Sequence, residues 1–420
     1  MKNTKKILII NPTSTRVNYI KDIRDAGYIP VVFVLPERKD TCNCGLFGDK
    51  LPTIYKLDNN YSKTLALAKK INPIFILTGN DYALELTLRL SKDLKLVATA
   101  YENFQTMHNK YLQQEALRKS RVRYIHTKTI TTTSDAKKYY KTLKNKKVVA
   151  KPVCGSSTIG VHICKNEKEF NIAINDIIAK RKSKAIIQEY IGGEEYVVNS
   201  VSYNGIHKIT SIWSYKKRVI PGYGPIYERL DFLSPKLKLS QKLIKYNLKV
   251  LKALHITYGA MHNEIKLDKK GPVLIEANCR VGGGSMPAKY LDKILGHHET
   301  DIVVKSYLNP KWFYKLPNEI IPIGHGIIKF LILKHDIKVS KIKFPQVFSK
   351  LPSFFTCNAG INGNVNQREV KYLKKTIDYE TSPGNIFMVN KNLKQLNADY
   401  NKIVDMENNH LEKLFDYKEI

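Results

Sequence analysis

The sequence lacks the features of a disulfide-rich, zinc-binding or membrane protein. Its six cysteines are scattered, with one C-x-C pair at Cys42 and Cys44 and no C-x-x-C. This spacing argues against a disulfide framework and against a zinc site. No apolar run approaches the roughly 18 residues of a membrane helix, and the apolar stretch within MKNTKKILII is too short for a signal peptide. These absences predict a cytoplasmic protein without a membrane span.

Acidic residues are scarce relative to basic ones. The chain has 37 Asp and Glu against 70 Lys and Arg, which gives a formal net charge of +33. Such a charge is typical of proteins that bind nucleic acid. However, the lysines are spread throughout the chain, no nucleic-acid-binding motif accompanies them, and an AT-biased genome would produce the same excess of Lys, Asn, Ile and Tyr. Nucleic-acid binding is therefore a minority hypothesis, and acidic substrates remain open.

The first part of the chain alternates strand and helix patterns. Apolar runs at 5–11, 30–36 and 73–79 predict strands, with helical patterns between them. This alternation predicts a doubly wound parallel sheet within residues 1–105. No G-x-G-x-x-G follows the first strand, so the dinucleotide-binding fingerprint is absent. Residues 78–81, TGND, end the third run at the sheet edge where such domains bind ligands.

A lysine and a glycine-rich loop follow in the next part. Residues 102–119 predict one helix that carries Lys110, with Met107, Tyr111 and Leu117 buried. In KVVAKPVCGSSTIGVHI, at 147–163, Lys151 ends a strand before a loop of small residues. Such a loop can bring backbone N–H groups to phosphate oxygens, and a plain hairpin turn remains the alternative. The loop residues are Gly155, Ser156, Ser157, Thr158 and Gly160.

Two further segments have both a functional and a structural interpretation. Residues 185–205 predict a strand, a glycine-bearing link and a second strand, with Glu189 and Glu195 at the two ends of the link. Such a link can offer backbone groups to adenine and a carboxylate to ribose, or it is an acidic hairpin. The aromatic and basic segment 211–232 is either a lid that closes over an anionic substrate or a surface loop. An amphipathic helix is expected at 240–254, with Leu243, Leu248, Val250 and Leu251 as core contacts.

The stretch from Tyr258 to Tyr290 carries the strongest constellation. Glu264 and Glu276 lie on what the pattern predicts as neighbouring strands, followed by Asn278, Arg280 and a run of glycines. Alternate residues of a strand share a face, so Glu276, Asn278 and Arg280 are expected to project together. Carboxylate and amide oxygens hold Mg²⁺ against nucleotide phosphates, and an arginine can bridge phosphate oxygens. A charged surface hairpin is the alternative interpretation.

These segments together resemble the ATP-grasp superfamily, and within it the carboxylate–amine ligases related to L-amino-acid ligases and biotin carboxylase. HNE at 262–264 and LIEANCRVGGG at 274–284 are the most specific parts of the resemblance. It implies an ATP-grasp fold of mixed α/β and α+β class. The expected parts are an N-terminal doubly wound parallel-sheet domain at 1–105, a mobile lid subdomain at 106–190, a core with the metal site at 191–318 and a C-terminal α+β piece at 319–420.

The resemblance also implies a role for each candidate residue. Lys110 and Lys151 are similar to the nucleotide lysines, and the 155–160 loop to the mobile glycine loop. Glu264, Glu276 and Asn278 match the magnesium residues, and Arg280 matches the arginine that stabilises phosphate. The nucleotide would further contact the adenine linker Glu189, Tyr190 and Ile191 and the ribose carboxylate Glu195. The link is one residue shorter than in some relatives, so Glu194 remains an alternative for the ribose, and Cys279 stands where relatives often have a small residue.

The implied activity is that of an ATP-dependent ligase that uses ATP with Mg²⁺ or Mn²⁺. A small carboxylate, expected to be an amino acid, is activated as an acyl phosphate and joined to an amine, with release of ADP and phosphate. The backbone N–H groups of Gly283 and Gly284 are candidate donors to the oxyanion. No general base for the amine is evident. A bicarbonate-activating enzyme and a non-catalytic ATP-binding regulator are the alternatives, and a homodimer is one expected assembly.

Overall fold

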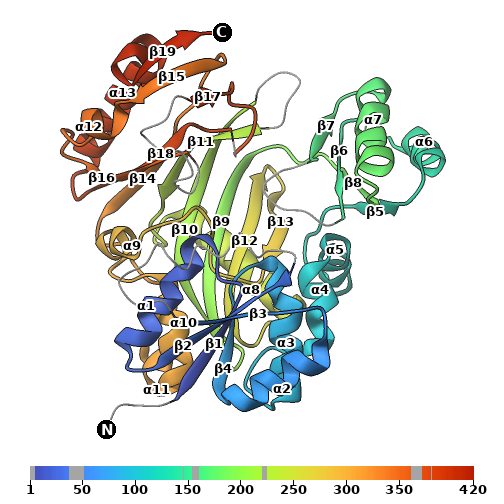
Figure 1. The fold of residues 1–420 in the computed structure, drawn as a ribbon. Coiled ribbons are helices and arrows are strands. Elements are labelled where there is room, and N and C mark those ends of the chain that lie inside the picture. Colours follow the sequence, from blue (N-terminus) through green and yellow to red (C-terminus); the bar gives the residue numbers. More distant parts are fainter. Residues whose placement is uncertain are drawn as a thin grey trace.

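The structure is a computed structural model, and it describes residues 5–36, 52–144, 146–153, 160–219, 225–360, 371–379 and 381–420. The strands of these residues form four sheets. Figure 1 shows a large twisted sheet at the centre, the N-terminal sheet below it, a small sheet with helices projecting to one side, and the C-terminal elements above. This arrangement is the expected mixture of a parallel N-terminal sheet and antiparallel sheets elsewhere.

The N-terminal sheet is parallel and has the strand order β3-β2-β1-β4. This confirms the predicted doubly wound arrangement, and its strands β1, β2 and β4 are nearly fully buried runs because helices cover both faces. β3 is an additional edge strand that the apolar pattern did not reveal. The elements are β1 (Lys6–Ile10), α1 (Asn18–Asp25), β2 (Ile29–Val34), β3 (Thr53–Lys56), α2 (Tyr61–Ile71), β4 (Pro73–Thr78) and α3 (Leu84–Asp93).

The helix predicted at 102–119 is interrupted at Asn109. The structure has α4 (Phe104–His108) and α5 (Lys110–Lys119), and the Asn109 side chain caps α5 by accepting from the backbone N–H groups of Tyr111 and Leu112. A side chain that caps a helix in this way competes with helix continuation. The break makes Lys110 the first residue of α5 and buries it, whereas an unbroken surface helix would leave a lysine solvated.

The small sheet at the side has the order β5-β8-β6-β7 and carries α6 and α7 on one face (Figure 1). Its separate core includes the stacked rings of Tyr140 and Phe170. Lys151 lies on β6 and is buried. The elements are β5 (Thr127–Ile130), α6 (Thr133–Thr142), β6 (Val148–Pro152), β7 (His162–Cys164), α7 (Glu167–Ile174), a π-helical turn at Asn175–Lys180 and β8 (Ala185–Glu189).

The central sheet has eight strands in the order β13-β12-β9-β10-β11-β14-β18-β16. Helix α8 packs against it through Leu243, Val250 and Leu251, whereas Leu248, predicted as a core contact, is 38% exposed. The elements up to β13 and the helices that follow are β9 (Glu194–Tyr203), β10 (Ile206–Val219), β11 (Pro225–Phe232), α8 (Lys238–Ala253), β12 (Gly259–Asp268), β13 (Gly271–Asn278), α9 (Ala288–Leu295), α10 (Glu299–Leu308) and α11 (Pro310–Lys315).

The interpretation of 211–232 as a closing lid or a surface loop is wrong for its described residues. Ser211–Val219 and Pro225–Phe232 belong to the paired strands β10 and β11 inside the central sheet. The aromatic residues that suggested a loop closing over a substrate instead alternate on a long hairpin, and Trp213 is buried. The tip of this hairpin, at 220–224, lies outside the described residues.

The C-terminal part is interleaved with the central sheet. β14, β16 and β18 extend it, so one sheet joins strands from 191–318 with strands from 319–420. The domain boundaries themselves stay predictions. The elements are β14 (His325–Phe330), β15 (Ile337–Ile342), α12 (Phe344–Phe348), β16 (Phe354–Ala359), β17 (Lys371–Leu373), β18 (Gly384–Asn390), α13 (Leu393–Asn409) and β19 (Phe415–Glu419).

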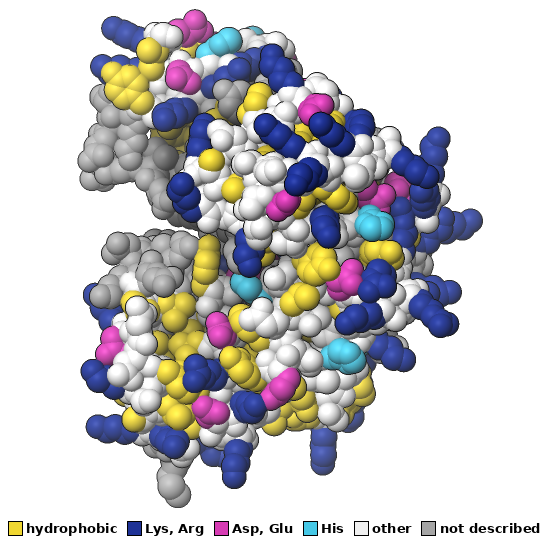
Figure 2. All heavy atoms as spheres, turned by 90° about the vertical axis from the view of Figure 1, so that its right-hand side faces the viewer, with side chains coloured by type: hydrophobic (Ala, Val, Ile, Leu, Met, Phe, Trp, Pro, Cys, Tyr) yellow, Lys and Arg dark blue, Asp and Glu magenta, His cyan; other side chains and the backbone are white. Residues whose placement is uncertain are grey.

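Basic side chains are distributed over the surface. Figure 2 shows Lys and Arg scattered across the face that it displays, with acidic and apolar side chains between them. The scatter is the pattern anticipated from the spacing of lysines in the sequence. Within the described residues, no helix combines the length and the apolar character that crossing a bilayer requires.

Candidate active site

The two candidate metal carboxylates lie opposite each other on neighbouring strands. In the antiparallel pair β12–β13, Glu264 is the register partner of Glu276, and His262 is that of Asn278. The register shifts after Glu264, since Leu274 pairs with Ile265 and Ile275 is the extra residue. Bulges of this kind re-aim side chains next to functional sites. The predicted pairing of these two strands is confirmed.

The negative charges of the carboxylates lie close enough to repel one another. Burial, and then the charges of Glu195 and Glu276, raise the pKa of Glu264 to about 7. The Nζ atom of Lys110 lies 2.7 Å from Glu276 Oε1. Asn278 Nδ2 donates to the carbonyl of His262 at 3.4 Å, which leaves its amide oxygen available as a ligand. Two carboxylates and an amide oxygen held close together in this way fit a divalent cation that prefers oxygen ligands.

The set is incomplete as an all-protein metal cage. Among the residues that the structure describes, no group of three or more His, Cys, Asp or Glu side chains could hold a metal ion. Magnesium commonly binds through one or two carboxylates plus substrate phosphates. The donor set therefore fits a cation that arrives with a polyphosphate.

Lysine side chains interact electrostatically with the carboxylates. Burial, together with the charge of Lys110, lowers the pKa of Lys151 to about 8, although Glu276 and Glu264 oppose this shift. Burial also acts against charge on Lys110, but Glu276 and Asp81 more than offset it, so its pKa is raised. Buried lysines that stay charged beside carboxylates make a cleft suited to anionic groups.

Lys217 also interacts electrostatically with Glu264, although the sequence analysis left it among the ordinary basic residues of 211–232. Its Nζ atom lies 2.5 Å from Glu195 Oε1, 4.5 Å from the ring centroid of Tyr227 and 5.3 Å from that of Tyr215. A cation between aromatic faces is stabilised by the ring quadrupoles. Tyr215 and Lys217 are two residues apart, so they share a face once the segment is known to be a strand. The sequence pattern could have indicated their contact only with that knowledge.

The link between β8 and β9 separates the two candidate ribose carboxylates. Glu195 pairs with Lys217 and interacts electrostatically with Glu264, whereas Glu194 is exposed and accepts from the hydroxyl of Tyr196. The position favours Glu195 as the carboxylate that lies in the site. A Cβ at Gly193 would lie 2.0 Å from the carbonyl oxygen of Leu267, and its φ is +83°. Only glycine therefore lets the link pass so close to β12.

The candidate adenine linker lies at the end of β8. Glu189 accepts from the backbone N–H of His126 at 3.1 Å. Lys147 stands 3.6 Å from the ring centroid of Tyr190, and Lys266 donates to the carbonyl of Ile191 at 3.1 Å. The linker is thus fixed at the junction of the small sheet and the central sheet.

Arg280 occupies a different place from the one that strand alternation predicted. β13 ends at Asn278, so the face shared by Glu276 and Asn278 does not extend to Arg280. Its Nε atom instead donates to Asp81 Oδ2 at 2.8 Å, across the boundary with the N-terminal domain. Burial opposes ionisation of Asp81, but Arg280 more than offsets it and holds the pKa of Asp81 below its usual range. The TGND segment thus does reach the site.

Residues that follow β1 form hydrogen bonds with the glycine loop after Arg280. Thr15 Oγ1 donates to the carbonyl of Gly283 at 3.0 Å, and Ser285 N donates to Ser14 Oγ at 2.8 Å. Within the described part of the chain, the backbone N–H groups of Gly283 and Gly284 have no hydrogen-bond acceptor. Backbone donors on a loop held in place by other residues are candidates for an oxyanion site.

A buried polar chain supports this loop. His262 Nδ1 lies 2.8 Å from Asn199 Oδ1, Asn199 donates to Ser211, and Ser211 donates to Glu299 at 2.9 Å. Burial lowers the pKa of His262 well below its usual value, so the ring is neutral. A Cβ at Gly282 would lie 2.7 Å from the Trp213 ring, so the loop rests directly on this layer.

The phosphate-loop residues Gly155, Ser156, Ser157 and Thr158 lie outside the described residues. Gly160, at the far end of that loop, has a φ of +73°. The interpretation of the loop as a phosphate-binding element therefore stays a prediction. Its position in the chain, directly after Lys151, places its attachment point at the cleft.

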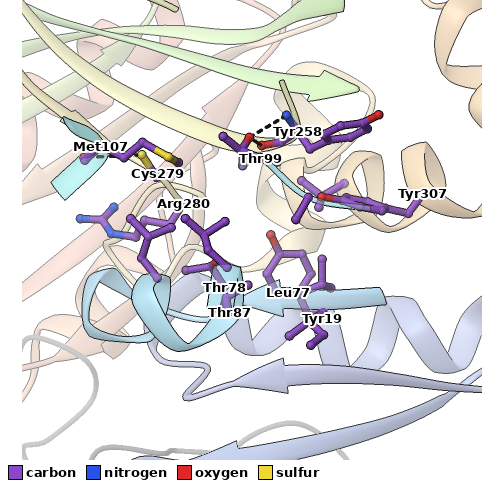
Figure 3. Close-up of a pocket in the computed structure, with 17 residues that line it drawn as sticks. Tyr19, Leu77, Thr78, Thr87, Thr99, Met107, Tyr258, Cys279, Arg280 and Tyr307 are labelled. Carbon is purple, nitrogen blue, oxygen red and sulfur yellow. Dashed lines mark hydrogen bonds between the residues drawn. The ribbon is translucent and has the colours of Figure 1, made fainter. Parts of the chain in front are cut away.

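Two cavities lie near the end of β13. The lining of one includes Asp81, His108, Lys110, Glu276 and Asn278. The other lies between the N-terminal sheet and β12 (Figure 3), and includes Tyr19, Tyr307 and Thr99. Figure 3 shows the guanidinium of Arg280 at the edge of this second cavity, on the side away from Tyr307. Leu84, Met107 and Cys279 line both cavities, so a charged cavity lies next to one lined by aliphatic side chains, hydroxyls and aromatic rings.

The comparisons with known proteins agree with this geometry. The family model of the ATP-grasp domain matches residues 144–288. This range includes Lys151, the linker, the carboxylate pair and Arg280. This part of the chain is therefore an ATP-grasp domain.

Three known proteins are similar to this chain over most of its length. Dapdiamide A synthase of Enterobacter agglomerans is 27% identical over 358 residues, which cover 83% of each chain. The crystal structure of an L-amino acid ligase from Bacillus licheniformis superposes with a TM-score of 0.76 at 17% identity, over 96% of this chain and 98% of that one. An N5-carboxyaminoimidazole ribonucleotide synthetase solved as its ADP complex gives a TM-score of 0.72 at 14% identity, over 97% and 98%. These two solved structures have the same fold as this chain.

Proposed function

We propose that this protein joins a small carboxylic acid, an amino acid by preference, to an amine at the expense of ATP, releasing ADP and phosphate. One observation carries the proposal: Lys110, Lys151 and Lys217 all interact electrostatically with the carboxylate pair Glu264 and Glu276. The name of dapdiamide A synthase indicates a product that contains amides, and this similarity supports amide formation as the reaction type.

The first half-reaction activates the acid. An oxygen of the substrate carboxylate attacks the γ-phosphorus of ATP, the bond to the β,γ-bridging oxygen breaks, and ADP leaves. A magnesium ion held by Glu264, Glu276 and Asn278 would offset charge on the phosphate oxygens. Lys110 and Lys151 bind the same anionic groups, and Arg280 orients the transferred phosphoryl group while Asp81 fixes its guanidinium.

The second half-reaction forms the amide. The amine attacks the acyl carbon, the tetrahedral intermediate carries an oxyanion, and phosphate leaves as the C–O bond breaks. The N–H groups of Gly283 and Gly284 are donors without acceptors in the described structure and would stabilise that oxyanion. Water would hydrolyse the acyl phosphate, so the small sheet with the 155–160 loop is proposed as the lid that excludes it.

The alternatives are less well supported. A bicarbonate-activating enzyme would use the same cleft, because the central chemistry up to the acyl phosphate is shared. A regulator that only binds ATP would gain nothing from the free donors of the glycine loop. A cytoplasmic location, a homodimer and the four domain boundaries are further predictions.

The test is an ADP-release assay over a panel of carboxylates, each with and without a panel of amines. Each assay is repeated without magnesium, and the product is identified by mass. ADP formation that requires both an acid and an amine, and a product whose mass equals their sum less water, supports the ligase. Formation of AMP, or ADP release that depends on bicarbonate alone, would overturn it.

A further inference from the structure

Gln113 is a buried polar side chain that the proposed mechanism does not use. It lies on α5, and it is 1% exposed. Its Nε2 atom donates to the backbone carbonyl of Ala277 at 2.8 Å, and its Oε1 atom accepts from the backbone N–H of Ala277 at 3.0 Å. One side-chain amide thus pairs with both polar backbone groups of a single residue of β13, as a residue of a neighbouring strand would.

The residue that Gln113 holds lies between two of the proposed metal ligands. Glu276 precedes Ala277 and Asn278 follows it, and all three belong to β13. Because neighbouring residues of a strand point to opposite faces, the side chains of Glu276 and Asn278 share one face, whereas Gln113 meets the strand at its edge. The hydrogen bonds at that edge therefore fix the stretch of backbone from which both ligand side chains project.

β13 depends on such support because it is an edge strand with a bulge. In the described part of the chain it pairs with β12 alone, and the register shifts next to Glu276. The outer N–H and C=O groups of an edge strand have no partner strand, and a buried backbone group without a hydrogen bond costs free energy. The bulge also disrupts the ladder to β12 locally. Without hydrogen bonds on its outer edge, the strand would carry its ligands on a weakly held backbone.

Helix α5 holds the strand at a second point, on the other side of the bulge. Gln114, also 1% exposed, donates from Nε2 to the carbonyl of Leu274 at 3.0 Å and accepts at Oε1 from the backbone N–H of Ile125 at 2.7 Å. The same helix begins with Lys110, which pairs with Glu276. Three side chains of one helix therefore contact β13 at Glu276 and on both sides of it.

From this arrangement we propose that Gln113 is a positioning residue for the divalent cation. By pairing with Ala277, it holds the two flanking ligands in the geometry in which their oxygens reach one metal ion. This rests on the proposed function and deepens it. Magnesium demands near-ideal octahedral geometry, so a site whose ligands are free to shift binds it less tightly, and groups that orient metal ligands contribute to metal affinity.

A purely structural role is the alternative, because Gln113 Nε2 also donates to the carbonyl of Met107 at 2.9 Å and so ties the end of α4 to β13. Both roles predict a lower free energy of unfolding when the side chain is changed. Only the positioning role predicts a weaker metal affinity in the folded protein. Gln113→Met keeps the length of the side chain and removes the amide, and Gln113→Asn keeps the amide on a shorter chain as the milder variant.

Thr376→Val is the matched control. Thr376 is 2% exposed, and its Oγ1 atom accepts from the backbone N–H of Leu333 at 2.9 Å in the C-terminal part of the chain. The valine variant therefore also removes a buried hydrogen bond between a side chain and the backbone, and it should lower stability without touching β13.

The test measures the binding of Mn²⁺ in the presence of ADP by electron paramagnetic resonance, at a temperature at which each variant is folded. The binding of ADP without metal is measured by calorimetry. We expect Gln113→Met to raise the Kd of Mn²⁺ about 10- to 100-fold, Gln113→Asn to raise it by a smaller factor, and the Kd of ADP without metal to stay unchanged. Metal affinity equal to that of the wild type in the folded Gln113 variants, or the same loss in Thr376→Val, would overturn the proposal.

This binding measurement separates the proposal from the proposed function, because it does not require turnover. A loss of Mn²⁺ affinity confined to the Gln113 variants supports the positioning role even if no pair of substrates releases ADP. A wild type that binds no Mn²⁺ together with ADP would refute it, whatever the ADP-release assay gives.

Discussion

Replacing Glu276 by glutamine should separate catalysis from stability. The carboxylate lies opposite Glu264 and 2.7 Å from Lys110 Nζ. Glutamine has the same shape and removes the charge. The substitution takes away one of two carboxylate ligands of the proposed metal site, whose stabilisation of phosphoryl transfer is worth several kcal/mol. A loss of about 4 kcal/mol corresponds to a fall of about a thousandfold in kcat/KM.

The cost to folding should be much smaller. The Lys110 side chain is 10% exposed and that of Glu276 is 23% exposed, so their ion pair is partly solvated. Lys110 also keeps attraction to Asp81 and Glu264 in the variant, and Glu264 loses a repulsive neighbour. We therefore expect the free energy of unfolding to fall by about 1 kcal/mol, below the 3–5 kcal/mol of a fully buried pair that loses one member.

The assay pairs ADP release with urea unfolding for the wild type, Glu276→Gln, Lys110→Met and the double variant. The double variant should regain stability relative to Glu276→Gln, because no lysine is left without its carboxylate, and should regain no activity. Glu115→Gln, which alters an exposed pair with Arg118 on α5, is the matched control. Wild-type turnover by Glu276→Gln, or an activity loss that merely follows the unfolded fraction, would refute the metal assignment.

Two further substitutions test the framework of the site. His298, whose ring nitrogens lie 2.9 Å from Asp22 and 2.7 Å from Asp292, has its pKa raised to about 10 because these carboxylates outweigh burial. A pKa raised above the unfolded value of about 6.5 stabilises the fold fully below pH 6.5 and progressively less as the pH rises toward 10. His298→Gln should therefore lower the free energy of unfolding by about 2 kcal/mol at pH 6.5 and by little at pH 10, and a difference that does not shrink between these pH values would contradict the assignment. Gly282→Ala should cost about 1–3 kcal/mol by overpacking against Trp213 and should slow turnover, whereas Gly192→Ala, with no atom nearer than 3.9 Å to the new methyl group, should leave the unfolding midpoint unchanged. Equal midpoints for the two alanine variants would show that the loop does not rest on that layer.

The local sequence pattern was sufficient to predict that the strands carrying Glu264 and Glu276 pair with each other. Glu264 and Glu276 could be placed on paired strands because a short polar turn separates two apolar runs, and hairpin neighbours pair. The parallel N-terminal sheet followed from the same kind of evidence, since buried parallel strands read as continuous apolar runs. Both were correct because they depend on residues close together in the chain.

Local pattern failed where distant segments decide the environment. Lys217 looked like one basic residue among several, because nothing nearby in the sequence indicates that Glu195 will lie beside it. Arg280 was expected to share a face of the strand with Glu276 and Asn278. The strand ends at Asn278, and the Arg280 side chain instead donates a hydrogen bond to Asp81, which is distant in the sequence. Gln113 carried no signal at all, since its pairing with Ala277 arises only when α5 packs against β13.

The sequence by itself determined the types of group available: two carboxylates, an amide, lysines, an arginine and glycines, in an order that matches one superfamily. Only the tertiary structure decided how their charges are balanced. Pairing Lys110 with Glu276, Lys217 with Glu195 and Arg280 with Asp81 requires contacts between residues 22 to 199 positions apart. Because burial makes each unpaired charge costly, these charged side chains can be withdrawn from water only where such contacts form.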